Sequence, residues 1–521
     1  MDNIEAIENE RVALQECLDL CKTQEERNRL GQFPTPTLLA EEILHYALQL
    51  MKAEARVSFL DPAIGTGSFF SALNKVVSTS QIDRALGFEI DPHYGEPAIS
   101  LWNEHNISIV LGDFTRAKPI QSYNLVICNP PYVRHHHIIG EEKVRLHQSV
   151  LGSTGIDLSG LAGLYCYFMG LSHPWMAPGA IAGWLIPSEF MDVNYGKAIQ
   201  KYLLNKVTLL HLHRFDPRDV QFADALVSSA VIWIKNELPP TDHQVRFTYG
   251  GSLLKPLKSL MVSSEALAAE PKWSRFPNAS VRKQKEQVRL ANFFKISRGI
   301  ATGDNKFFIL TEHQIAQMGL PFEEFCPILP SPRYLSQDLV EDKGDGSPNI
   351  EKRLFLLNTR LKEDEIKKAY PKLFDYLESG KAKGVHSRYL CSHRTIWYAQ
   401  ENRPAAPIVC TYLGRSDSKG GRPFRFILNR SAATVANVYL AMYPTLLMQK
   451  CIKKDPGLVQ RVWAELNSLS PEVLLGEGRV YGGGLHKLEP RELANLPADF
   501  ILPLIGESLL DAAPKQLSLI A

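Results

Sequence analysis

The chain has 521 residues, of which 45% are hydrophobic and 22% charged, as in ordinary globular proteins of more than one domain. No run of about 18 apolar residues occurs, which excludes a conventional membrane-spanning helix. The acidic N-terminus does not resemble a signal peptide. The eight cysteines are scattered along the chain, so we expect a cytoplasmic protein without a disulfide framework.

The net charge of +2 conceals an uneven distribution. In residues 1–240 acidic side chains outnumber basic ones by eight, whereas in the remainder basic side chains exceed acidic ones by ten. A basic half is typical of proteins that contact a polyanion such as DNA. Chance variation in surface charge is the alternative, and the counts alone do not separate the two.

The first half of the chain has the pattern of an α/β fold. Residues 1–30 predict an amphipathic N-terminal helix, which GQFPTP (31–36) separates from a second helix beginning at Thr37. Short apolar runs then alternate with segments able to form helices, which predicts a doubly wound, seven-stranded sheet over residues 31–240. The expected strands are 56–60, 85–90, 107–114, 124–128, 180–187, 207–213 and 226–235.

The second half is irregular. The polar segment NELPPTDHQ (236–244) predicts a domain boundary. Beyond it, four stretches mix basic, glycine and aromatic residues, and we expect a mixed α+β domain over 245–521. These stretches are 280–289, 297–308, 414–426 and 481–490.

A glycine-rich turn follows the first predicted strand. In open α/β sheets ligands bind at the C-terminal ends of the strands, and here the strand enters DPAIGTG (61–67). Gly65 and Gly67 allow a sharp turn and close approach of a ligand. The turn is not a dinucleotide fingerprint, because Phe70 replaces the third glycine, and no Gly-Lys-Ser/Thr follows as in a P-loop.

Carboxylates end the next two predicted strands. Glu89 in GFEID can accept hydrogen bonds from ribose hydroxyls, and Asp113 in GDF can accept one from the exocyclic amine of adenine. Each carboxylate could instead cap the end of a strand. Together with Asp61 beside the glycine-rich turn, they predict a nucleoside site.

The fourth predicted strand ends in Asn129-Pro130-Pro131-Tyr132. Pro-Pro is a common end to a strand, and Asn before Pro commonly opens a turn. In the company of DPAIGTGSF, GFEID, GDF and GQFPTP, however, this motif resembles the amino-group DNA methyltransferases that use S-adenosylmethionine. The motif order resembles their gamma class of adenine-N6 enzymes from restriction–modification systems. The resemblance covers residues 30–235 and extends more loosely through SRGIATGDNKFF and GGGLHKLEP.

The resemblance implies a Rossmann-like S-adenosylmethionine-dependent methyltransferase domain with a C-terminal DNA-recognition domain. Its reaction would be methyl transfer to N6 of an adenine flipped out of double-stranded DNA. The amine is a poor nucleophile, so acceptors for its hydrogens assist the reaction. By resemblance these are the Asn129 side chain and the Pro130 carbonyl, fixed by Pro131, with Tyr132 stacking on the base. Phe222 is the second aromatic candidate, or else a core residue at a strand start.

The resemblance also implies the residues around the cofactor. GQFPTP would close over the methionine part, and Asp61 would anchor its end. The expected cofactor-binding set is Gln32, Phe33, Thr35, Pro36, Asp61, Ala63, Gly65, Gly67, Glu89, Ile90, Asp113, Phe114 and Asn129.

Basic residues of the second half are candidates for DNA contacts, because phosphate positioning and groove reading use such side chains. Each could equally be a solvated surface charge. No metal is expected, since the adjacent His135, His136 and His137 cannot easily converge on one ion. The DNA-binding candidates are Arg298, Lys306, Arg415, Arg422, Arg425 and Lys487.

Several alternative functions remain. Cytosine N4, RNA adenine and the amide of a protein glutamine pose similar chemistry, although the basic second half favours DNA. A catalytically idle DNA-binding specificity module is a further alternative, which the intact Asn129–Tyr132 motif disfavours. We expect a monomer that provides the modification activity, with any restriction endonuclease on a separate chain.

Overall fold

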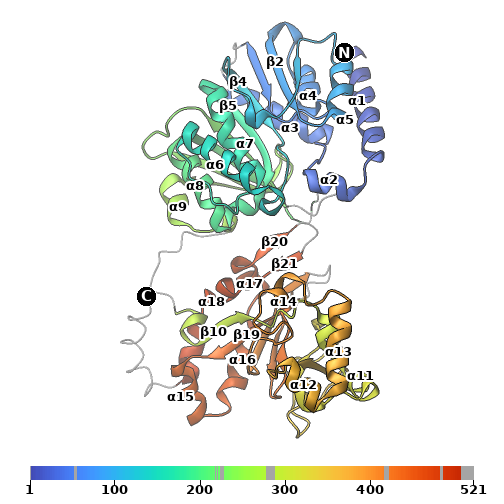
Figure 1. The fold of residues 1–521 in the computed structure, drawn as a ribbon. Helices are drawn as coiled ribbons and strands as arrows, with labels where there is room; N and C mark the ends of the chain where they lie inside the picture. Colours follow the sequence, from blue (N-terminus) through green and yellow to red (C-terminus); the bar gives the residue numbers. More distant parts are fainter. Residues whose placement is uncertain are drawn as a thin grey trace. The chain divides into compact units, whose positions relative to one another are not determined.

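A computed structural model describes residues 2–51, 56–217, 219, 221–222, 228–276, 288–415, 422–481 and 485–505 (Figure 1). By their contacts these residues form two compact units. Unit 1 lies within Met1–Arg282 and Tyr481–Gly484, and unit 2 lies within Lys283–Val480 and Leu485–Ala521. In the described part of the chain, no helix has the length and apolar character needed to span a membrane.

Unit 1 is built on one large sheet. Among the described residues, nine strands lie in the order β3-β2-β1-β4-β5-β7-β6-β8-β9. Strands β1 to β5 run parallel, and β7 is antiparallel to both of its neighbours, β5 and β6. All seven expected strands are present, and the α/β fold is confirmed. The strands are β1 Val57–Asp61, β2 Ile82–Glu89, β3 Ser108–Leu111, β4 Tyr123–Cys128, β5 Met176–Pro187, β6 Thr208–Arg214, β7 Ser229–Lys235, β8 Gln244–Gly251 and β9 Pro256–Ser263.

The expected domain boundary at 236–244 and the expected count of seven strands are wrong. Strand β8 pairs in parallel with β6, and β9 pairs antiparallel with β8, so both extend the same sheet. The polar Pro-Pro segment is a loop within unit 1. Val245 and Phe247 are buried, and this short alternation is the sequence signal for β8. The exposed Lys258 on the edge strand β9 fits the charge that protects sheet edges.

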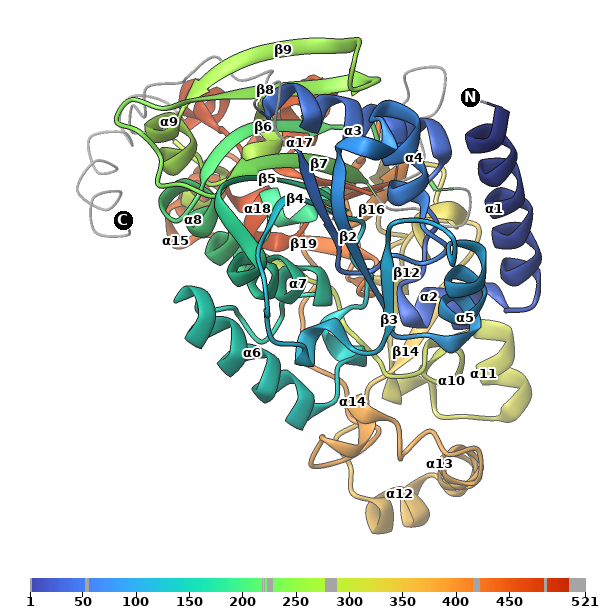
Figure 2. The same cartoon turned by 90° about the horizontal axis from the view of Figure 1, so that it is seen from above.

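Alternating side chains of the strands fill two hydrophobic cores, one on each face of the sheet. In β4, Leu125 and Ile127 belong to the core formed with α3, α4 and α5, whereas Val126 and Cys128 belong to the core formed with α6, α7 and α8. Figure 2 shows these two groups of helices on either side of the sheet. The helices are α3 Thr37–Leu50, α4 Ser68–Val76, α5 Pro92–Leu101, α6 Gly140–Thr154, α7 Leu164–Ser172, α8 Lys197–Asn205 and α9 Ser264–Ala269.

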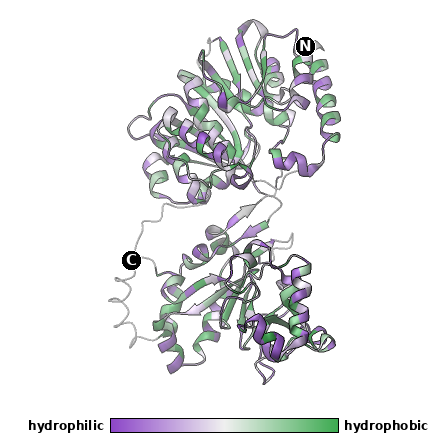
Figure 3. Cartoon of the chain, viewed as in Figure 1, coloured by the Kyte–Doolittle hydropathy of each residue, from purple (hydrophilic) through white to green (hydrophobic). Residues whose placement is uncertain are grey.

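The N-terminal segment forms two helices rather than one, α1 Asp2–Leu20 and α2 Gln24–Leu30. Thr23 interrupts them, because its side chain accepts from the backbone N–H of Glu26 and caps α2. Helix α1 mixes hydrophilic and hydrophobic residues (Figure 3) and packs against α4 and α5. The N-terminal segment is therefore part of unit 1.

Unit 2 has the mixed α+β character that the sequence predicts. Its described strands form three sheets, in the orders β10-β19-β15-β17-β13, β11-β14-β12-β18 and β16-β21-β20. The strands are β10 Phe294–Arg298, β11 Ile309–Thr311, β12 Phe325–Leu329, β13 Leu339–Val340, β14 Leu354–Leu357, β15 Ile408–Thr411, β16 Leu413–Arg415, β17 Phe426–Asn429, β18 Thr434–Val435, β19 Tyr439–Pro444, β20 Arg479–Tyr481 and β21 Leu485–Lys487. The helices are α10 Asn305–Phe308, α11 Glu312–Met318, α12 Glu363–Ala369, α13 Pro371–Ala382, α14 Tyr389–Ser392, α15 Leu446–Lys454, α16 Leu458–Ser468, α17 Pro471–Glu477, α18 Pro490–Ala494 and α19 Leu502–Ile505.

Candidate active site

The C-terminal ends of β1, β2 and β4 meet where the strand order of unit 1 reverses. Asp61 ends β1, Glu89 ends β2, and Asn129 follows the last residue of β4. Asp113 lies two residues beyond β3, the outermost strand on that side. The fold therefore brings these side chains to one edge of the sheet, where ligands of open α/β sheets bind.

The glycine-rich loop, residues 61–67, is anchored on one side and open on the other. Gly65 and Gly67 have φ of 56° and 96°, a conformation that favours glycine. A Cβ on Gly67 would lie 2.4 Å from Nε1 of Trp102, which also donates to the Thr66 carbonyl at 2.9 Å. Around Gly65, by contrast, no described atom lies within 4 Å of a Cβ position, so a ligand can approach the backbone there.

Two carboxyl groups are held beside this loop. Glu89 accepts from the backbone N–H groups of Gly65 at 3.0 Å and Asp91 at 2.9 Å, and burial raises its pKa. Asp61 accepts from the Ala63 N–H at 3.1 Å. Burial, with the nearby Glu89, raises the pKa of Asp61 to about 8. A cationic ligand at the loop would stabilise the ionised form of both groups.

The third carboxylate has protein partners. Asp113 Oδ1 accepts from the Thr115 N–H at 2.8 Å and from its hydroxyl at 2.7 Å. Oδ2 lies 3.2 Å from Arg116 and 3.9 Å from Arg145. Asp113 thereby caps the short helix Phe114–Arg116, and a ligand would share an acceptor already in use.

Two of the hydrophobic cofactor candidates, Phe114 and Ile90, differ in exposure. Phe114 is only 2% exposed and packs against Phe88 and Trp175, with ring centroids at 5.3 and 5.6 Å. Its expected contact with a cofactor is not supported for the side chain, because the ring is buried in the core. Ile90, next to Glu89, is 65% exposed and available to a ligand.

The strap, residues 31–36, is bound to the Asn-Pro-Pro-Tyr turn. Asn129 Nδ2 donates to the Phe33 carbonyl at 2.8 Å and to the Thr35 hydroxyl at 3.2 Å. The Tyr132 N–H donates to the Gly31 carbonyl at 3.1 Å. Gly31 has φ of 67°, and a Cβ there would lie 2.3 Å from the Tyr132 nitrogen, so this close approach requires glycine.

One atom of Asn129 is left without a protein partner. Its Oδ1 is buried and receives no hydrogen bond from any residue that the structure describes. The two acceptors on Nδ2 fix the amide, so Oδ1 points away from the strap atoms that hold Nδ2. A buried acceptor without a donor costs about 1–3 kcal/mol. The atom is thus a ready acceptor for a donor on a bound ligand.

Three aromatic rings gather beside Asn129. The ring centroids of Phe33 and Tyr132 lie 5.6 Å apart, and Phe222 lies 5.8 Å from each of them. The Tyr132 hydroxyl donates to the Leu185 carbonyl at 3.0 Å, and Phe222 is 3% exposed. The ring planes of Tyr132 and Phe222 lie at 82° to each other, so a planar base fits between the two rings only after one ring moves.

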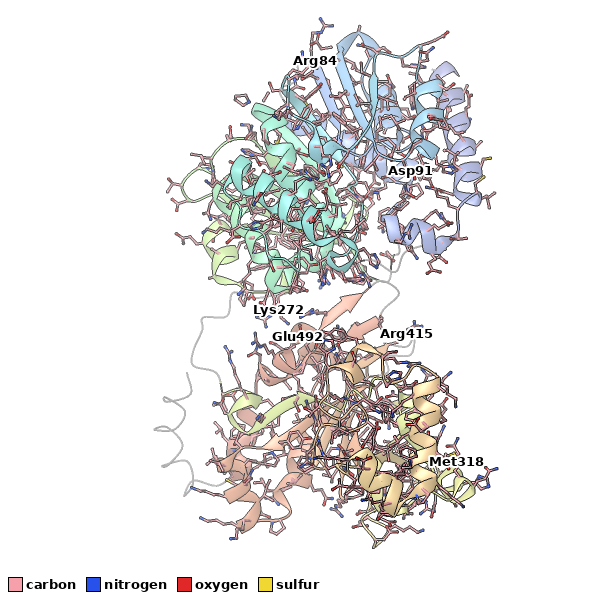
Figure 4. All side chains as sticks on the ribbon, viewed as in Figure 1. Arg84, Asp91, Lys272, Met318, Arg415 and Glu492 are labelled. Atoms are coloured by element: carbon pink, nitrogen blue, oxygen red, sulfur yellow. The ribbon has the colours of Figure 1, made fainter. Side chains whose placement is uncertain are left out.

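Gln32 contacts an ion pair, Lys22 with Asp91, that the sequence did not predict. Its Nε2 donates to Asp91 at 2.7 Å, and Lys22 donates to both Gln32 and Asp91. Burial opposes ionisation of Asp91, but these hydrogen bonds lower its pKa. Asp91, labelled in Figure 4, also caps α5 through the His93 N–H. Pro36 is exposed at the start of α3.

In unit 2 two of the DNA-binding candidates share one aromatic ring. The Arg298 guanidinium lies 4.0 Å from the ring centroid of Tyr412 and donates to the Asn437 carbonyl at 3.2 Å. Lys487 Nζ lies 5.3 Å from the same centroid and pairs with Glu489 at 2.8 Å. The structure thus brings together two residues that are distant in sequence.

The other basic candidates fall into two groups. Arg425 holds the loop 332–338, donating to Asp338 at 2.8 Å and to the Leu335 carbonyl at 2.7 Å, so its role is structural. Lys306, Arg415 (Figure 4) and Arg422 are exposed. In the described residues, His135, His136 and His137 belong to no cluster of three or more groups able to hold a metal.

Sequence comparisons identify similar proteins. Two family models match the chain: "Eco57I restriction-modification methylase" over residues 79–221 and "Type II methyltransferase M.Eco57I, C-terminal domain" over 277–516. Type II methyltransferase M.XamI of Xanthomonas campestris pv. amaranthicola is 28% identical, and M.AccI of Acinetobacter calcoaceticus is 26% identical. Each alignment covers 90% of this chain and 85% of the relative. Among solved structures, type IIL restriction-modification enzyme MmeI in complex with DNA gives a TM-score of 0.49 at 13% identity, covering 85% of this chain and 63% of that one.

Proposed function

The chain belongs to the restriction–modification DNA methyltransferases that use S-adenosylmethionine, and on that premise we propose that it methylates N6 of adenine in double-stranded DNA. The target adenine is flipped out of the helix, because N6 is otherwise enclosed in the base stack. The finer assignments below rest on the geometry of unit 1.

The residues at the sheet edge fit S-adenosylmethionine, which when bound supplies a methyl group on a positively charged sulfur. Ala63, Gly65 and Gly67 shape a loop with an open side at Gly65. The buried carboxyls of Asp61 and Glu89 favour a cationic ligand. We assign Asp61 to the methionine end of the cofactor and Glu89 to its ribose. Ile90 and Asp113 are assigned to its adenine.

The observation that carries the choice of an amine target is the fixed amide of Asn129. Its Oδ1 is buried, and no donor reaches it within the described part of the chain. The N6 lone pair is delocalised into the adenine ring, so attack requires the nitrogen to become tetrahedral. Asn129 Oδ1 and the Pro130 carbonyl would accept the two amine hydrogens as this occurs. Such preorganised groups each contribute about 10²–10³ in rate.

The aromatic rings give the flipped base its place. Tyr132 is held through its backbone by Gly31 and through its hydroxyl by Leu185, so it provides a fixed stacking face. Phe222 contacts Tyr132 at a steep angle. We propose that Phe222 moves aside as the adenine enters and then packs against it.

Unit 2 is assigned to DNA binding. Arg298 and Lys487 on Tyr412, with the exposed Lys306, Arg415 and Arg422, would contact phosphates or base edges. Arg425 is removed from the set of DNA contacts because of its structural bonds. We propose that the chain acts as a monomer in the cytoplasm, as the modification partner of an endonuclease on a separate chain.

The experiment that tests the Asn129 assignment compares Asn129→Ala with wild type. We expect transfer of tritiated methyl groups to DNA at saturating S-adenosylmethionine to fall by about 10²-fold or more, a loss separate from any weakening of cofactor binding that follows because Asn129 also holds the strap. The matched control is Asn103→Ala, which removes an exposed asparagine of unit 1 and should retain wild-type activity. Unchanged transfer in Asn129→Ala would contradict the assignment, as would loss of transfer that merely follows loss of cofactor binding.

A further inference from the structure

Helix α1 carries a buried ion pair outside all the recognised motifs. Glu8 is 4% exposed and Arg11 is 2% exposed. Arg11 donates from Nε and Nη2 to the two carboxylate oxygens of Glu8, each at 2.7 Å. Paired charges in an interior recover their desolvation cost only partly, so a buried pair is poor evidence for stability. Its best-attested use is to fix how neighbouring elements fit together.

The remaining N–H groups of Arg11 reach the glycine-rich loop. Nη1 donates to the Thr66 hydroxyl at 3.1 Å and to the Ser68 hydroxyl at 3.0 Å. The Thr66 hydroxyl in turn donates to Gln15, also on α1, at 2.7 Å. Helix α1 therefore holds the loop at the residues that flank Gly67.

The same pair reaches the end of the strap. Thr37 follows Pro36 directly, and its hydroxyl donates to Glu8 and lies 3.4 Å from Arg11 Nη2. Two residues earlier, Thr35 accepts from Asn129. One planar guanidinium and one carboxylate thus connect the glycine-rich loop with the strap that holds Asn129.

A second contact from the N-terminal segment acts near the other end of the strap. Lys22, just beyond α1, donates to Gln32 at 3.3 Å and to Asp91. Its Nζ also lies 4.9 Å from the ring centroid of Tyr94 on α5. The segment before GQFPTP therefore contacts the strap region at both ends, which a merely adjacent helix would not require.

We propose that Glu8 and Arg11 are positioning residues for S-adenosylmethionine: they set the spacing between the glycine-rich loop and the strap, so that both meet the cofactor together. This inference deepens the proposed cofactor site and rests on it, but it does not depend on which base is methylated. The bidentate guanidinium has one orientation that satisfies all its acceptors, so it fixes geometry as a lysine would not. A misplacement of about 1 Å at such a site can cost about 10²-fold in rate.

The decisive variant is Glu8→Leu with Arg11→Met. Apolar side chains of similar volume often replace a buried ion pair without loss of stability, so the melting temperature should be maintained. We expect the dissociation constant for S-adenosylmethionine, measured by calorimetry without DNA, to rise about tenfold or more. The matched control is Glu41→Leu with Lys75→Met, which removes a partly exposed ion pair between α3 and α4 and should bind the cofactor like wild type.

Thr66→Val supplies an independent arm, because it leaves the ion pair intact and removes only the hydroxyl that Arg11 and Gln15 share. We expect weaker cofactor binding in the same direction. Wild-type cofactor affinity in both the double variant and Thr66→Val would overturn this inference and leave the proposed cofactor site intact. So would an equal loss in the control pair. A wild-type protein that fails to bind S-adenosylmethionine would overturn the proposed cofactor site and this inference with it.

Discussion

The buried carboxyl of Asp61 should make cofactor binding depend on pH. Burial, with Glu89 nearby, raises its pKa from 3.8 to about 8. At pH 7 the free enzyme therefore carries Asp61 mostly protonated, in a ratio of roughly ten to one. S-adenosylmethionine brings positive charge, which favours the carboxylate and lowers the pKa of Asp61 in the complex.

The sign and size of the effect follow from linkage. The complex binds fewer protons than the free enzyme, so affinity rises with pH and levels off above the free-enzyme pKa of about 8. The expected slope below that pH approaches tenfold per unit, or about 1.4 kcal/mol for each pKa unit. Binding at pH 7 should release nearly one proton through Asp61.

Calorimetry in buffers of different ionisation enthalpy measures this proton release directly. Asp61→Asn is the matched control, because it keeps an acceptor for the Ala63 N–H but cannot titrate. Any proton release that persists in this variant comes from other groups, such as the cofactor's own α-amino group, whose pKa lies near 8. Equal proton release in wild type and Asp61→Asn, or a wild-type affinity that is flat between pH 6 and 8, would refute the reasoning.

Other consequences concern the target base, the DNA and stability. Phe222→Ala should weaken binding of a flipped base by about 1–3 kcal/mol, and unchanged 2-aminopurine fluorescence at the target position would contradict this. Arg298→Ala and Lys487→Ala should each weaken DNA binding and reduce its salt slope by about one, whereas Arg425→Ala should lower the melting temperature and leave that slope unchanged. Burial, with Arg246 nearby, lowers the pKa of His211 to about 3 and of His213 to about 4. Both histidines stay neutral in the folded protein but become protonated in the unfolded chain below about pH 6.5. The free energy of unfolding should therefore fall between pH 6.5 and pH 4, and this fall should be smaller in His211→Phe than in wild type. A melting temperature that is constant over this range would contradict it.

The parts of the site that are local in sequence could be predicted. Glu89 is the last residue of its strand, and Gly65 and Asn129 lie a few residues beyond the ends of theirs. Parallel strands bring such residues to one edge of the sheet. The apolar runs in 31–240 were long enough to identify all seven expected strands. The family resemblance nominates Phe222 from its place before β7, and in the structure its ring lies beside that of Tyr132.

The remaining features depend on tertiary contacts that carry no local signal. The salt bridge of Lys22 with Asp91 joins residues far apart in sequence, and the Glu8–Arg11 pair looks like an ordinary exposed i, i+3 pair until α1 packs on the loop. The polar residues of segment 236–244 suggested a domain boundary, because nothing in that segment indicates that the following strand β8 pairs with β6. Arg425 was a plausible DNA contact in the sequence, because the carbonyl groups that accept its hydrogen bonds lie in a loop about 90 residues earlier in the chain.

The central claim is that Asn129 presents an acceptor to the N6 amine of a DNA adenine. The most direct measurement transfers tritiated methyl from S-adenosylmethionine to unmethylated genomic DNA, digests the product to nucleosides and identifies the labelled one, with Asn129→Ala alongside. The account predicts label in N6-methyladenine that is lost in the variant. Label in N4-methylcytosine, or no label in DNA from a protein that binds the cofactor, would contradict it.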